Sequence, residues 1–132
     1  MPAMQTLGTT ARYALGGVRI LAGGTGLLAP AMIINRFGED NPSANPAAIY
    51  GLRLFGIRTL LIGADLIRLR GRDLDHALRA APLIHATDTA TVLTLQRKKQ
   101  LSPERARPLA LISGLNTVLA VMAYLAARRS RR

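Results

Sequence analysis

A run of 20 residues from Pro108 to Ala127 contains no charged side chain. An α-helix rises 1.5 Å per residue, so a helix of this length is about 30 Å long and matches the hydrocarbon core of a bilayer. The preceding Ser102, Pro103 and Glu104 have the chemistry of a helix start: an N-cap, a proline at the first helical position and an acidic first turn. We therefore predict a membrane-spanning helix over about residues 103–127.

Three more apolar blocks precede this one, at about residues 13–34, 47–67 and 77–95. The segment between the first two is rich in Asn, Pro and Gly, which is typical of a loop. Glycines in the first block would let a neighbouring helix approach closely in lipid, and Gly71 is where we expect the second helix to stop. The predicted fold is all-α, an integral membrane four-helix bundle forming a single domain over residues 1–132.

The block at 77–95 is the least apolar of the four. Its Asp88 would cost about 2.5 to 3.5 kcal/mol at the centre of a bilayer, whereas a Leu, Ile or Val contributes only about 0.3 to 0.6 kcal/mol. Since the block has six such residues, we expect it to cross only with partner helices. In the alternative, this block lies on the cytoplasmic face, which fits the distribution of basic residues somewhat better. We favour four spans.

The net charge of +11 raises the possibility of nucleic acid binding. Most of the 18 Lys and Arg residues, however, gather at the ends of the apolar blocks, as they do beside anionic lipid head groups. No zinc-finger spacing or aromatic–basic RNA motif accompanies them, so we expect no nucleic acid partner. The chain has no cysteine, and no phosphate-loop Gly-Lys-Ser/Thr follows its glycines. We expect no metal and no cofactor.

Polar side chains within the blocks define the candidate site. Counting along antiparallel helices places Arg58, His85, Asp88 and Asn116 near one depth in the middle of the membrane, and Arg19 and Asp65 at a second level. Because an unpaired charge in hydrocarbon is costly, we predict the pairs Arg58–Asp88 and Arg19–Asp65. The candidate catalytic acid–base residues are His85, Asp88 and Asp65. The candidate binding residues are Arg58, Arg53, Arg19 and Asn116.

The second block also carries a resemblance. The run Ala48-Ile49-Tyr50-Gly51-Leu52-Arg53-Leu54-Phe55-Gly56-Ile57-Arg58, followed by Leu60-Leu61-Ile62-Gly63, resembles the second helix of small actinobacterial membrane proteins of unknown function in the broader DoxX-like group. The resemblance covers this block and the spacing of the other three. It implies four membrane helices in a bacterial inner membrane, and it supplies no reaction and no catalytic residue.

Several functions stay open on these residues. The first is a structural protein or accessory subunit of a membrane complex, because the chain is small and has small-residue helix faces. The second is a membrane-embedded enzyme, such as an isomerase, cyclase or epoxide-opening hydrolase, that acts on a lipophilic small molecule. The third is transport of protons or small solutes, for which four short helices leave little room. The expected partners are membrane lipid and either further copies of the chain or a larger complex, and the expected location is the cell inner membrane as a multi-pass protein.

Overall fold

The computed structural model describes residues 2–131, which form five α-helices and one 3-10 turn. The α-helices are α1 (Pro2–Leu28), α2 (Pro30–Arg36), α3 (Pro46–Arg68), α4 (Gly71–Arg97) and α5 (Pro103–Arg129), and the 3-10 turn η1 (Pro42–Ala44) precedes α3. No strand occurs within residues 2–131. The all-α prediction is confirmed. The last three predicted helices correspond to α3, α4 and α5.

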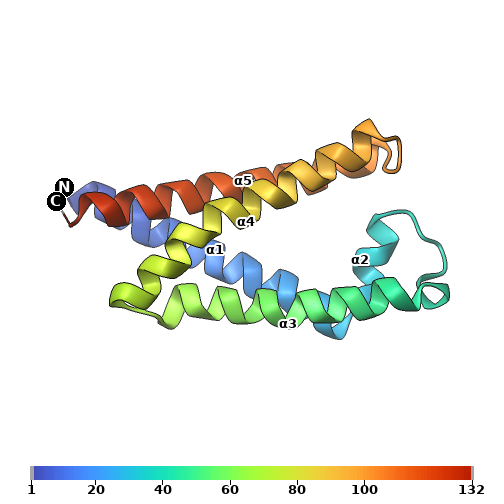
Figure 1. The fold of residues 1–132 in the computed structure, drawn as a ribbon, viewed down its shortest axis with the longest axis horizontal. Coiled ribbons are helices and arrows are strands. Elements are labelled where there is room, and N and C mark those ends of the chain that lie inside the picture. Colours follow the sequence, from blue (N-terminus) through green and yellow to red (C-terminus); the bar gives the residue numbers. More distant parts are fainter. Residues whose placement is uncertain (1, 132) are drawn as a thin grey trace.

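The first predicted helix, at 13–34, is wrong as a single straight span. The helix begins earlier, at Pro2, and breaks at Ala29, where α2 leaves α1 at 102°. Pro30 has no backbone N–H to donate and its ring disfavours a helical residue before it, so Ala29 adopts φ −138° and ψ 57°. The fold therefore has a fifth, short helix that projects from the end of α1 (Figure 1).

The connection between α3 and α4 also differs from the prediction. Gly71 does not stop α3, which ends at Arg68, and instead begins α4 with a positive φ of 59° that glycine adopts without strain. The start of α5 agrees with the prediction, with Ser102 at the N-cap position and Pro103 as the first helical residue. Ser102 makes no capping hydrogen bond through its side chain.

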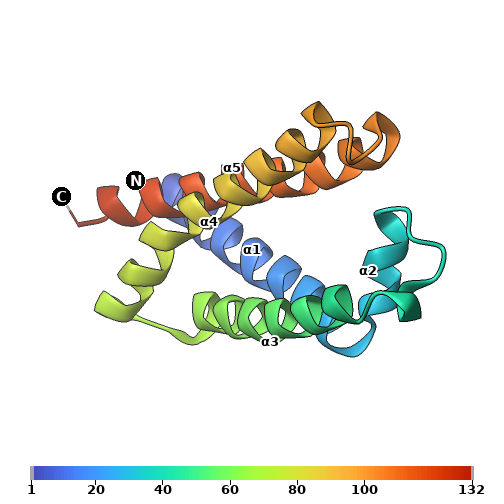
Figure 2. The same ribbon diagram turned by 45° about the vertical axis from the view of Figure 1, so that its right-hand side comes forward.

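The helices run up and down along one long axis. Both termini and the α3–α4 connection lie at one end, and the α4–α5 turn and α2 lie at the other (Figure 1). Helix α1 packs against α3 on one side and α5 on the other, and α4 packs along α5. In both views α3 and α4 diverge from their connection, so the molecule consists of two helix pairs joined through α1 (Figures 1 and 2).

Small residues bring α1 and α3 into close contact. A Cβ atom added at Gly23 would lie 2.6 Å from the Gly56 carbonyl oxygen, and one added at Gly56 would lie 2.6 Å from the Gly23 carbonyl oxygen. Both distances are too short, so only glycine permits this approach of the backbones. Gly17 and Gly24 face open space. The predicted glycine packing face is therefore confirmed for one side of α1.

The apolar core lies near the end that holds the termini. Leu15 of α1, Leu66 of α3 and Leu78 of α4 are fully or almost fully buried there, and α5 contributes the small side chains Ala120 and Ala123. Elsewhere large apolar side chains are exposed, including Leu111 and Leu115 on α5 and Tyr50 and Leu61 on α3. By length and hydropathy α3 and α5 can each cross a membrane, and the bent α1–α2 pair makes a third span if it counts as one.

Candidate functional site

One buried polar contact joins the two helix pairs. Arg19 on α1 is 5% exposed and His85 on α4 is 1% exposed. Arg19 Nη1 lies 2.7 Å from His85 Nε2 and 3.2 Å from Nδ1. The stem of Arg19 packs beside α3, since a Cβ atom added at Gly63 would lie 3.0 Å from the Arg19 Cβ. Arg19 thus contacts α3 with its stem and α4 with its guanidinium.

The chemistry of the two groups fixes the direction of this hydrogen bond. A guanidinium can only donate, so the imidazole nitrogen that it contacts must accept and carries no proton. A neutral ring keeps its proton on the other nitrogen, and His85 Nδ1 lies 3.8 Å from Asp88 Oδ2. That separation is longer than a hydrogen bond. The Asp88 side chain is 47% exposed, so this carboxylate is at the surface of the bundle while His85 is inside it.

Both predicted ion pairs are absent from the contacts of residues 2–131. Asp65 Oδ1 lies 2.8 Å from Arg68 Nη2 on its own helix, so it does not pair with Arg19. Within the same range Arg58 makes no ion pair, and Asp88 lies nearest to His85 among the ionisable partners recorded. The prediction that Arg19 lies at a different level from His85 is also wrong, because the long Arg19 side chain reaches His85 on α4 inside the bundle.

Arg58 lies outside the buried layer because of its direction on α3. The side of α3 that faces α1 carries Gly56, Thr59 and Gly63, all buried. Arg58 follows Gly56 by two residues and therefore points about 200° away from it around the helix axis. Arg58 and Arg53 are both exposed. Counting along a helix gives the depth of a residue and its angle relative to other residues, but it does not give the face that packs against another helix.

Asn116 is the remaining predicted residue, and it is buried in α5 at 8% exposure. Helices α4 and α5 run antiparallel from the turn between Arg97 and Pro103, so Asn116 lies about level with His85. The buried layer therefore holds Arg19, His85 and Asn116, with Asp88 at its edge. Among residues 2–131 no cluster of three or more His, Asp or Glu side chains is arranged to hold a metal ion.

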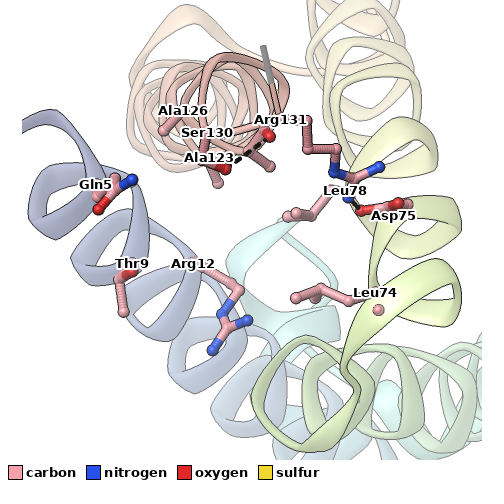
Figure 3. A pocket seen from close by; sticks show the side chains of 13 residues that line it. Gln5, Thr9, Arg12, Leu74, Asp75, Leu78, Ala123, Ala126, Ser130 and Arg131 are labelled. Carbon is pink, nitrogen blue, oxygen red and sulfur yellow. Dashed lines mark hydrogen bonds and ion pairs between the residues drawn. The ribbon is translucent and has the colours of Figure 1, made fainter. Parts of the chain in front are cut away.

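A second polar region, which the sequence did not indicate, lies at the end that holds the termini. A cavity of about 370 Å³ there is lined by residues of α1, α4 and the C-terminal end of α5 (Figure 3). Arg12 points toward it from α1, and Arg131 pairs with Asp75 across it. The helix predicted at about residues 13–34 leaves Arg12 outside it, whereas Arg12 lies well inside α1. The early start of α1 is the reason that it was missed.

The chain was compared with protein families, curated proteins and solved structures. No family model matches it, and no curated protein or solved structure gives a match either. The resemblance to the DoxX-like group gains no support from these comparisons and stays a prediction.

Proposed function

We propose that the chain is a small multi-pass membrane protein that serves as a structural or accessory subunit of a membrane complex. The observation that carries this proposal is the pair of exposed arginines on α3. This helix is long and apolar enough to cross a membrane, yet Arg53 and Arg58 are exposed near its middle. A charged side chain near the centre of a bilayer costs about 2.5 to 3.5 kcal/mol on insertion scales, so the helix requires a partner there.

The surroundings of the two arginines support a protein partner. Tyr50, Leu54 and Leu61 are exposed on the same helix and offer an apolar surface that lipid or another helix can cover. Lipid tails cannot compensate a guanidinium, whereas a carboxylate on a neighbouring membrane helix can form paired hydrogen bonds with it. The proposed occupant of this surface is a membrane helix of another protein that carries Asp or Glu at mid-membrane depth.

The buried layer is assigned a structural role in this proposal. Arg19 and His85 bond to each other in the interior, and their contact is the polar link between α1 and α4. The exposed carboxylate of Asp88 beside His85 favours acid–base catalysis as a second candidate, because a lipophilic substrate could reach Asp88 from the bilayer. Asp88→Asn distinguishes the structural role from the catalytic one. It should leave complex formation intact if the layer is structural, and it should abolish turnover of the lipophilic substrate if the layer is catalytic.

The partner surface predicts a crosslinking result. A photoreactive amino acid in place of the exposed Ile57 should capture a membrane protein in cells, at a peptide that contains Asp or Glu within an apolar segment. Arg53→Leu combined with Arg58→Leu should reduce this product at least about tenfold, because the charge-assisted contacts of both arginines are lost. Arg72→Leu, a change at an exposed arginine outside α3, should leave it unchanged. A product of twice the chain mass, or one insensitive to both arginines, would overturn the accessory proposal.

We further propose that α4 crosses the membrane beside α3, α5 and the bent α1–α2 pair, which are the candidate spans by length and hydropathy. This arrangement predicts how the two connections are exposed. The chain has no cysteine, so Arg72→Cys beside the α3–α4 connection and Gln100→Cys in the α4–α5 turn each provide a single label site. These positions lie at opposite ends of the molecule (Figure 1). A membrane-impermeant thiol reagent added to intact spheroplasts should label one of them and spare the other. Equal labelling of both from the same side would mean that α4 does not cross.

A further inference from the structure

The cavity between α1, α4 and α5 has the size of a ligand site. Its volume of about 370 Å³ falls within the range of roughly 300 to 1,000 Å³ typical of small-molecule pockets. Its walls combine the apolar side chains Leu74 and Leu78 with the polar side chains of Gln5 and Thr9 (Figure 3). It opens at the end of the bundle that holds the termini.

The charges at this cavity favour an anion. Arg131 pairs with Asp75, which compensates the one acidic side chain of the lining. Arg12 makes no ion pair within residues 2–131, and its guanidinium points into the space between α1 and α4 (Figure 3). The lining therefore carries one net positive charge, located on Arg12.

The hydrogen bonds of Arg12 are also incomplete. Its Nε atom is buried and has no hydrogen-bond partner among residues 2–131. The guanidinium lies over the ring of Tyr13, with its central carbon 4.6 Å from the ring centroid, which holds it in place by a cation–π contact. Because Nε is covered, a ligand in the cavity would accept hydrogen bonds from the terminal Nη groups of Arg12 instead.

We propose that this cavity binds a phosphate ester, with Arg12 as the residue that contacts the phosphate and Thr9 and Gln5 as further hydrogen-bond donors. The fork of a guanidinium matches two phosphate oxygens, which a bare ammonium does not. The cavity exceeds a phosphate ion and leaves room for the glycerol part of a phospholipid, and basic pockets between membrane helices are known sites for anionic head groups. The lipid source rests on the proposed membrane location, whereas the phosphate chemistry does not.

The test is native mass spectrometry of the whole chain in mild detergent with added phosphatidylglycerol. The unchanged protein should retain the lipid, and Arg12→Gln should lower the retained fraction about tenfold because a charge-assisted contact is lost. Arg12→Lys keeps the charge and loses the fork. The fraction of lipid that it retains should therefore lie between the fractions retained by the unchanged protein and by Arg12→Gln. Arg72→Gln is the matched control, since Arg72 is an exposed arginine near the same end and does not line the cavity.

Competition distinguishes the two sources of phosphate. If inorganic phosphate at millimolar concentration does not displace the lipid, the ligand is a lipid head group; if it does, the site takes a soluble phosphate ester. Both results support the assigned chemistry provided that Arg12→Gln lowers the retained fraction of lipid. Equal retention by the Arg12→Gln and unchanged proteins, with equal helical circular dichroism, would overturn the proposal, and so would equal retention of uncharged diacylglycerol. Extraction of the protein by alkaline carbonate would instead overturn the membrane location alone.

Discussion

Replacing His85 with leucine is expected to lower the free energy of unfolding in detergent by about 3 kcal/mol. The change removes the acceptor of the Arg19 guanidinium and leaves a charged group at 5% exposure inside the bundle. Asp88, at the edge of the layer, can compensate part of this charge, which keeps the loss at the lower end of the range for broken buried pairs. Denaturation by sodium dodecyl sulfate, followed by helical circular dichroism, measures the change.

The partner substitution should be milder. Arg19→Met removes the charge and leaves His85 neutral with an unsatisfied nitrogen, for which we expect a loss of about 1 kcal/mol. His76→Leu is the control, because His76 is an exposed histidine on the same helix and its loss should change stability by less than about 0.5 kcal/mol. A larger loss for Arg19→Met than for His85→Leu would contradict the assignment of the buried charge.

Gly56→Ala is expected to destabilise the protein by about 1 to 3 kcal/mol, even though alanine favours a helix over glycine by about 1 kcal/mol. The added methyl group would lie 2.6 Å from the Gly23 carbonyl oxygen and would push α1 and α3 apart. Because backbone atoms surround this position, no side-chain rotation relieves the clash. Thermal unfolding in detergent reports the change.

Gly51→Ala on the same helix is the matched control. A Cβ atom at Gly51 meets nothing within 4 Å, so the helix preference of alanine should act alone and leave stability equal or slightly higher. Gly24→Ala provides the same control on α1. If Gly56→Ala and Gly51→Ala behaved alike, the close approach of α1 and α3 would be wrong.

The helices were predictable because apolar blocks and the residues that end them are local features of the sequence. The boundaries of α3 and α5 are within a few residues of the expected ones, and Asn45 caps α3 by accepting a hydrogen bond from the Ala48 N–H. The break at Pro30 was also a local signal, but the apolar residues on both sides of it concealed the bend. The early start of α1 could not be read from hydropathy, because Pro2 to Arg12 are more polar than the block that follows.

The partners within the candidate site were not predictable in the same way. Arg19 and His85 were each recognised as polar groups inside apolar blocks, but which of them meet depends on helix tilt and on the face that each helix presents. The glycines of α3 turn Arg58 outward, and Gly63 makes room for the stem of Arg19 to reach α4. Asp65 lies one helical turn from Arg68, and this local pair replaced the long-range pair with Arg19.

We infer that Arg19 and His85 are a structural pair joining α1 to α4, and the double variant Arg19→Met with His85→Leu measures the coupling between them. Groups in contact couple, whereas independent sites add to within about 0.5 kcal/mol. The double variant replaces both partners with apolar side chains, so it should unfold no more easily than His85→Leu alone, which gives a coupling energy of at least about 1 kcal/mol. Strictly additive losses from the two substitutions would contradict the claim.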